Sequence, residues 1–112
     1  MSTVELAAQA ERDLRAIRDF YRHAPEGGEG VARSILDQLE QAALSLETLP
    51  GRGSLVPELE RVGVRAFREL HVKPYRMIYE IRGEVVIVHA VLDARRDVQT
   101  LLADRLLRWS AD

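Results

Sequence analysis

The chain has 112 residues, of which 46% are hydrophobic and 30% are charged, a balance typical of one small globular domain. It contains no cysteine, which excludes disulfides, thiolate metal sites and cysteine nucleophiles. The sequence has no apolar run of the roughly 20 residues that a membrane span requires, and its N-terminal segment lacks the apolar stretch of a signal peptide. We therefore expect a single soluble domain over residues 1–112 that has no contact with a membrane and lies in the cytoplasm.

The net charge of −2 is unevenly distributed along the chain. Residues 1–60 carry 6 basic and 11 acidic side chains, whereas residues 61–112 carry 10 basic and 7 acidic ones. The C-terminal half is therefore predicted to be the side that faces anions or phosphates. This excess is small beside the basic surface of a dedicated nucleic-acid-binding protein, so charge alone does not predict RNA binding.

The N-terminal half is predicted to form a short strand and two helices. Residues 3–6 alternate between polar and apolar side chains, as in a strand, and the spacing then becomes helical. The first helix is expected to end near His23, because Pro25 follows, and a second helix is predicted over residues 29–49. We expect the two helices to form an antiparallel hairpin with an acidic outer surface. The side chains expected to face inward are Ala10, Leu14, Ile17 and Tyr21 in the first helix and Ala32, Ile35, Leu36, Leu39, Ala43, Leu46 and Leu49 in the second.

The segment after the second helix is predicted to be a loop that leads into a sheet. Residues 50–63 include two prolines and three glycines and show no clear period. Residues 64–72 then alternate as a strand that ends before Pro74.

A β-hairpin and a last helix complete the predicted elements. Residues 75–92 read as a hairpin with Gly83 at the turn, and the second arm is apolar on both faces except at His89. That pattern predicts a strand inside a sheet and covered on both sides. Asp97 is the predicted N-cap of the last helix. The order β-α-α-β-β-β-α predicts an α+β domain in which a helical hairpin and a C-terminal helix pack on a small, mostly antiparallel sheet.

Arg76 and His89 are the polar exceptions in the apolar hairpin. Two interpretations stay open for Arg76, an ion pair with an acid such as Glu69, Glu80 or Asp93, or contact with a ligand. For His89 we favour a hydrogen-bonded core residue over a catalytic acid or base. His89 and Asp93 share a strand face without a third ligand, so we predict no metal site, and no cofactor is indicated.

Arg95 and Arg96 stand where the last strand ends and the last helix begins. Side chains project from the sheet edge there, and the N-terminus of a helix favours anions. We expect one arginine to bridge to the acidic helices and the other to remain free for an anion.

Four segments in order resemble the RelE/ParE superfamily of bacterial toxins, and the resemblance spans nearly the whole chain. They are Ala10-Glu11-Arg12-Asp13-Leu14-Arg15-Ala16-Ile17, Leu49-Pro50-Gly51-Arg52-Gly53, Tyr75-Arg76-Met77-Ile78-Tyr79 and Ala94-Arg95-Arg96-Asp97. The resemblance implies a toxin of a type II toxin-antitoxin system. It also implies a cognate antitoxin whose C-terminal segment wraps the toxin and masks its activity.

The superfamily implies two alternative targets. Its RelE-like branch cuts mRNA on the ribosome, whereas its ParE-like branch lacks that ribonuclease site and poisons DNA gyrase. If this chain were a ribonuclease, the catalytic candidates would be Arg76, His89, Arg95 and Arg96, which could supply phosphate-binding cations and a proton donor or acceptor. The family's ribonucleases often carry a tyrosine or histidine near the C-terminus, and the last helix here carries neither, which favours the non-catalytic ParE-like branch. A third alternative is an inactive member that retains only antitoxin binding.

Two sets of contact residues follow from these interpretations. The candidates for binding the target or an anion are Arg65, His71, Lys73, Arg76, Arg95 and Arg96. An amphipathic antitoxin segment is expected to lie beside the helical hairpin and reach the C-terminal helix. The candidates for that contact are Leu14, Ile17, Tyr21, Leu39 and Trp109.

Overall fold

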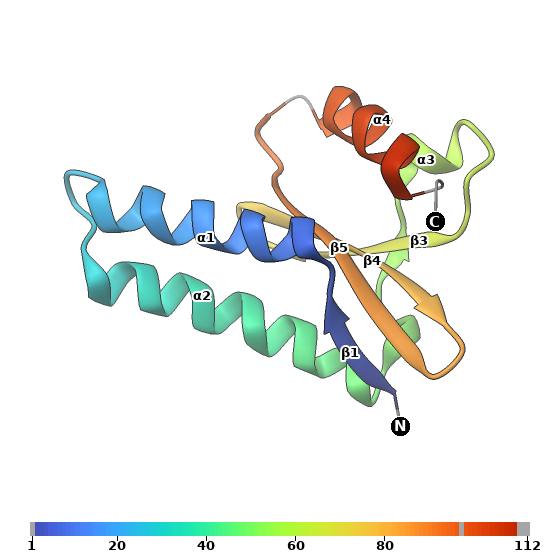
Figure 1. The fold of residues 1–112 in the computed structure, drawn as a ribbon, viewed down its shortest axis with the longest axis horizontal. Helices are drawn as coiled ribbons and strands as arrows, with labels where there is room; N and C mark the ends of the chain where they lie inside the picture. Colours follow the sequence, from blue (N-terminus) through green and yellow to red (C-terminus); the bar gives the residue numbers. More distant parts are fainter. Residues whose placement is uncertain (1, 97, 110–112) are drawn as a thin grey trace.

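The computed structural model describes residues 2–96 and 98–109, and its elements follow the predicted order (Figure 1). The elements are β1 (Thr3–Leu6), α1 (Ala8–His23), α2 (Glu29–Leu44), β2 (Ser54–Leu55), α3 (Pro57–Glu60), β3 (Phe67–Val72), β4 (Tyr75–Arg82), β5 (Val85–Asp93) and α4 (Val98–Trp109). Two 3₁₀ turns, Ser45–Glu47 and Pro50–Arg52, lie between α2 and β2. The predicted N-cap Asp97 falls outside the described residues. Within those residues no helix is both long enough and apolar enough to cross a membrane.

The five strands form one sheet in the order β1-β5-β4-β3-β2. Strand β1 runs parallel to β5, and the other neighbouring strands are antiparallel. Gly83 occupies the turn between β4 and β5 with a φ of 60°, a conformation that glycine adopts without strain. Strand β5 therefore lies between β1 and β4, which confirms the predicted interior strand.

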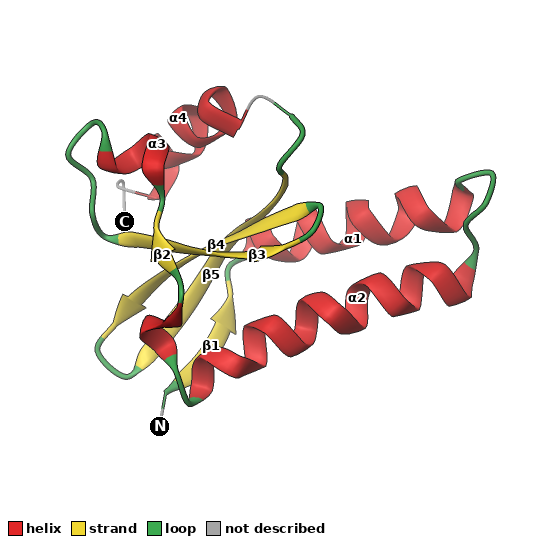
Figure 2. Cartoon of the chain, turned by 180° about the vertical axis from the view of Figure 1, so that it is seen from behind, coloured by secondary structure: helices red, strands yellow, loops and turns green. Residues whose placement is uncertain are grey.

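Both faces of the sheet are covered. Figure 2 shows the α1–α2 hairpin on one side of the sheet and α3 with α4 on the other. The hairpin side holds a core that includes Leu39, Met77 and Tyr79, whereas Ile78 and Leu102 belong to the core under α3 and α4. Adjacent residues of β4 thus enter opposite cores, as the alternation of a strand requires.

A bulge in β5 changes which residues face each core. Ile78 pairs with Ala90 and Tyr79 pairs with Val88, so His89 is the extra residue between two paired positions. His89 contacts the rings of Phe67 and Trp109 in the core under α3 and α4, and Ala90 lies in the same core. The bulge therefore places two consecutive side chains on the same face.

Three of the predicted boundaries were wrong. The loop predicted over residues 50–63 contains β2 and α3, which at two and four residues are too short to show a period. The strand predicted from residue 64 begins at Phe67, and the helix predicted through residue 49 ends at Leu44. The 3₁₀ turn that follows α2 advances the chain by a larger angle per residue, which changes the phase of the apolar stripe. Leu49, predicted to face inward, is consequently 63% exposed.

The turn before β2 is held by a buried tyrosine. The backbone N–H of Gly53 donates to the Tyr79 hydroxyl at 3.0 Å, and that hydroxyl donates to the carbonyl of Pro50 at 2.7 Å. Arg68 also donates to the carbonyl of Gly53 at 2.8 Å. Because a Cβ on Gly53 would lie 2.5 Å from the Glu69 carbonyl oxygen, only glycine fits this position.

We expect Gly53→Ala to lower the free energy of unfolding by about 2 kcal/mol, because the added methyl group forces the turn away from the sheet. Urea denaturation followed by circular dichroism measures the change. Gly51→Ala in the same turn is the matched control, since a Cβ there meets nothing within 4 Å. Equal stabilities of the two variants would contradict this account of the turn.

Candidate functional site

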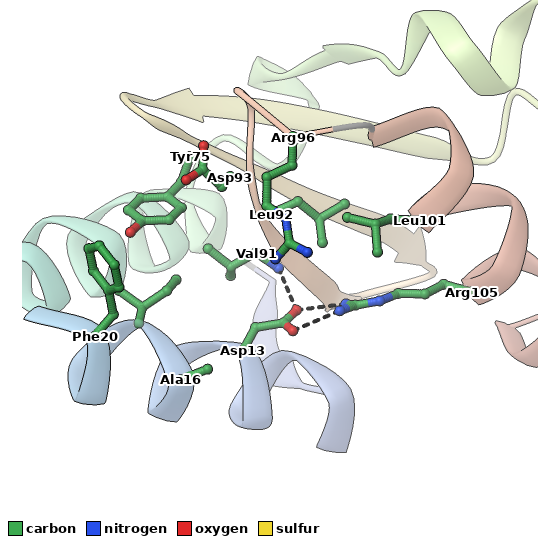
Figure 3. Close-up of a pocket in the computed structure, with 11 residues that line it drawn as sticks. Asp13, Ala16, Phe20, Tyr75, Val91, Leu92, Asp93, Arg96, Leu101 and Arg105 are labelled. Carbon is green, nitrogen blue, oxygen red and sulfur yellow. Dashed lines mark hydrogen bonds and ion pairs between the residues drawn. The ribbon is translucent and has the colours of Figure 1, made fainter.

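A pocket of about 360 Å³ lies where α1, β5 and α4 meet (Figure 3). We call it the α1–α4 pocket. Its lining combines apolar side chains with two carboxylates and two arginines. The lining residues are Asp13, Ala16, Ile17, Phe20, Tyr75, Val91, Leu92, Asp93, Arg96, Leu101 and Arg105.

Asp13 joins the three elements around this pocket. Its carboxylate accepts the backbone N–H of Val91 at 2.9 Å and two N–H groups of Arg105 at 2.7 and 2.8 Å. The side chains of Asp13 and Arg105 are only 10% and 13% exposed. A paired, nearly buried carboxylate of this kind fixes the position of α4 and is poorly suited to receive a substrate proton.

Arg96 is the available cation of the pocket. Figure 3 shows its side chain extending from the segment after β5 into the pocket. Within the described part of the chain its guanidinium forms no hydrogen bond or ion pair. Arg95 instead donates two hydrogen bonds to the carboxylate of Asp93, at 3.0 and 2.7 Å, and these hold the pKa of Asp93 below its usual range. Arg95 is therefore paired, whereas Arg96 has no ion pair with any described residue. The pair of Arg95 forms with Asp93 of the preceding strand and not with the acidic helices.

An exposed aromatic side chain forms the outer wall of the pocket. Phe20 on α1 is 61% exposed and contacts Tyr21 edge to face, with ring centroids 5.1 Å apart. Tyr75 donates from its hydroxyl to the Tyr21 hydroxyl at 3.2 Å, and burial raises the pKa of Tyr75. The pocket thus offers an apolar surface next to a free positive charge.

Arg76 is a structural residue in this fold. Its guanidinium donates to both carboxylate oxygens of Glu58 at 2.7 Å, and its Nε donates to Glu69 at 2.7 Å. The residue is 8% exposed, and the hydrogen bonds that it donates to Glu58 raise its pKa above the ordinary value for arginine. Glu69 was among the predicted partners. Glu58 was missed because α3, which carries it, was expected to be loop.

The other predicted anion-binding residues do not gather into one site. His71 contacts the buried carboxylate of Glu69 at 2.9 Å, and Arg65 pairs with Glu60 at 2.8 Å. Lys73 is exposed at the turn between β3 and β4. Arg96 lies in the α1–α4 pocket, so these predicted residues are spread over several parts of the surface.

His89 is enclosed by neighbouring side chains. It is 5% exposed, lies 2.9 Å from a carboxylate oxygen of Glu80, and contacts the rings of Phe67 and Trp109 at centroid distances of 5.5 and 4.9 Å. This environment is that of a hydrogen-bonded core residue, as the sequence favoured. Its only predicted metal partner, Asp93, pairs with Arg95, and the described residues contain no group of three potential metal ligands.

The residues proposed to contact an antitoxin divide by accessibility. Ile17, Leu39 and Trp109 are buried at 8%, 1% and 8% exposure, whereas Leu14 and Tyr21 are partly exposed. Phe20 is far more accessible than any of these and was not among the candidates. Phe20 precedes Tyr21 by one residue and so lies outside the apolar stripe of the helix. A large aromatic residue outside that stripe is predicted to be exposed, and this sequence signal could have identified Phe20.

Comparison with known proteins identifies similar chains. A family model described as the ParE toxin of the type II toxin-antitoxin system parDE matches residues 4–98. The chain is 35% identical over 106 residues to Toxin ParE of Escherichia coli, a match that covers 95% of this chain and 98% of that protein. A solved structure described as the chromosomal ParDE TA system from P. aeruginosa has the same fold, with a TM-score of 0.68 and 19% identity over 83% of this chain and 96% of that one.

The environment of Glu58 leads to a prediction about acid sensitivity. Hydrogen bonds from Arg76 hold the pKa of Glu58 below its ordinary value, so on acidification the unfolded chain binds a proton before the folded chain does. The stabilisation is complete above the ordinary glutamate pKa and is lost as the pH falls through the lower folded-state value. Between about pH 6 and pH 3, we expect the free energy of unfolding to fall less steeply in Glu58→Gln than in the wild type.

Urea denaturation at a series of pH values measures this slope. Glu60→Gln is the matched control, because Glu60 is 45% exposed and forms only a surface ion pair with Arg65. The control should keep the wild-type slope. A wild-type slope in Glu58→Gln would show that the ion pair with Arg76 does not stabilise the fold.

Proposed function

Because the chain belongs to the family of ParE toxins of type II toxin-antitoxin systems, we propose that it inhibits DNA gyrase by binding it and that a cognate antitoxin masks this activity. The gyrase target follows from the resemblance to the ParE-like branch. We infer inhibition by binding, and not by catalysis, because Arg76 and His89, which a ribonuclease would use, are already engaged by other residues of the fold.

One observation supports binding over catalysis above all. Arg76, the central cation of the ribonuclease hypothesis, is engaged by two glutamates, and no substrate phosphate can reach it without displacing them. His89 is enclosed by two rings and a carboxylate. General acid-base catalysis requires groups within hydrogen-bond reach of the reacting atoms, and the partners that already occupy Arg76 and His89 oppose such contact.

The α1–α4 pocket is the surface that best fits an antitoxin segment. Phe20 and Leu101 provide an apolar wall, and Arg96 provides a positive charge whose guanidinium forms no hydrogen bond or ion pair in the described part of the chain. A complementary segment would place an apolar side chain against Phe20 and a carboxylate against Arg96. Leu14 and Tyr21, predicted as antitoxin contacts, lie on the same helix as Phe20.

The gyrase target is tested with purified components. We expect the full chain to inhibit DNA supercoiling by gyrase and to leave ribosome-bound mRNA intact, because binding and not phosphodiester cleavage is its action. Addition of the antitoxin should restore supercoiling. Cleaved mRNA would contradict the proposal and make Arg96 the first catalytic candidate, and the absence of both effects would indicate a member that only binds its antitoxin.

Antitoxin docking is tested by Arg96→Glu and Phe20→Ser. We expect each variant to weaken antitoxin binding about tenfold or more in isothermal titration calorimetry, because the first reverses a complementary charge and the second removes an apolar contact. Arg61→Glu and Val62→Ser are matched controls, since both residues are exposed after α3, away from the pocket. Wild-type affinity in both pocket variants would place the antitoxin elsewhere.

A further inference from the structure

A second pocket, of about 330 Å³, lies where the beginning of α1 meets β5 and the end of α4. We call it the arginine pocket. Four arginines contribute to its lining, and no carboxylate does so within the described residues. The lining residues are Ala7, Ala8, Gln9, Arg12, Arg82, Ile87, His89, Arg105, Arg108 and Trp109. By contrast, the α1–α4 pocket contains Asp13 and Asp93.

We propose that the arginine pocket binds a phosphate group of the backbone of duplex DNA. This inference rests on the proposed gyrase function in one respect, the choice of DNA as the source of the phosphate. Guanidinium groups bind phosphate through paired hydrogen bonds, and a pocket lined by several of them, with no carboxylate among its described residues, concentrates anions.

Two of the four arginines are available for a ligand. Among the described residues, Arg12 donates only to the neutral side chain of Gln9, at 3.2 Å. Arg108 is 66% exposed and lies 3.6 Å from the carboxylate of Asp104, which is 70% exposed. Because such an exposed ion pair contributes little free energy, a phosphate can replace Asp104 as the partner of Arg108. Arg82 pairs with Glu80 and Arg105 pairs with Asp13, so these two hold the walls of the pocket.

The N-terminus of α1 adds to the positive field of the pocket. Ala7, the N-cap, gives no side-chain hydrogen bond to the first turn, and Ala7, Ala8 and Gln9 all line the pocket. In a helix of 16 residues the first backbone N–H groups and the aligned peptide dipoles attract an anion. The helix end therefore acts on the same ligand as Arg12 and Arg108.

The surroundings favour an extended polyanion over a single small phosphate. Arg15 lies one turn beyond Arg12 on α1, is exposed, and forms no hydrogen bond or ion pair within the described part of the chain, so the cations continue outside the pocket. His89 and Trp109 are buried against each other, at 5% and 8% exposure, so little of either ring is accessible for stacking a base. Contact with single-stranded nucleic acid usually includes such stacking, whereas contact with a duplex backbone does not.

This surface corrects the charge distribution predicted for the helical hairpin. Of the two helices, α2 carries three acids and one arginine, as expected of an acidic face. Helix α1 carries four arginines, and one of its three acids, Asp13, is engaged by Arg105. The acidic surface predicted for both helices therefore belongs to α2 alone, and α1 can approach a polyanion at its N-terminal end.

Fluorescence anisotropy with a labelled DNA duplex of about 20 base pairs tests the proposal on the full chain without gyrase. We expect binding at low salt, and we expect Arg12→Gln/Arg108→Gln to weaken it about tenfold. Because both arginines contact one phosphate and each lost phosphate contact lowers the salt slope by about 0.9, the slope of the double variant should be shallower by roughly 1. Neither arginine forms a buried ion pair, so the variant should fold, which circular dichroism checks.

Arg33→Gln/Arg61→Gln is the matched control, since it removes the same charge from exposed positions outside the pocket. If the control pair weakened binding equally, the loss of affinity would be due to net charge alone, and the proposal would be overturned. The proposal would also be overturned by failure to bind the duplex, by tighter binding of an RNA of the same sequence, or by full competition by millimolar inorganic phosphate. Duplex binding without gyrase inhibition would support the pocket and contradict the proposed function, whereas gyrase inhibition without duplex binding would do the reverse.

Discussion

The two-sided burial of β5 is the constraint on which the rest of the structure depends. Its side chains enter both cores, so the sheet needs a cover on each face. The α1–α2 hairpin supplies one cover, and the other is assembled from two separate pieces, α3 and α4. Each piece is fixed by an arginine and a carboxylate, Arg76 with Glu58 for α3 and Arg105 with Asp13 for α4.

These ion pairs determine which cations remain for other tasks. Buried charges must be paired, and breaking such a pair costs more than breaking one on the surface. Arg76 and Arg105 are therefore committed to the fold. Arg96 and Arg12 form no ion pair with any other described residue, and they line two different pockets. The antitoxin contact and the DNA contact that we propose therefore use separate surfaces.

The sequence predicted the fold better than the site. Long periodic segments such as α1 and β5 were predicted in type and place, because their period is repeated several times. The position of Glu58 could not be predicted, because a helix of four residues has no period and its ion pair with Arg76 spans 18 residues of the sequence. The bulge at His89 could not be predicted either, because strand register depends on the partner strand and not on the local sequence pattern.

The parallel pairing of β1 with β5 has a consequence for synthesis. Strand β1 leaves the ribosome well before its hydrogen-bonding partner, which begins at Val85, and before Arg105, which pairs with Asp13. Contacts of such long sequence separation form late. The two helices of the hairpin can pair early, but the complete surface around α4 exists only once α4 itself has been made. A chain that stops before α4 would therefore lack Leu101 and Arg105 of the α1–α4 pocket and could not present that surface to a partner.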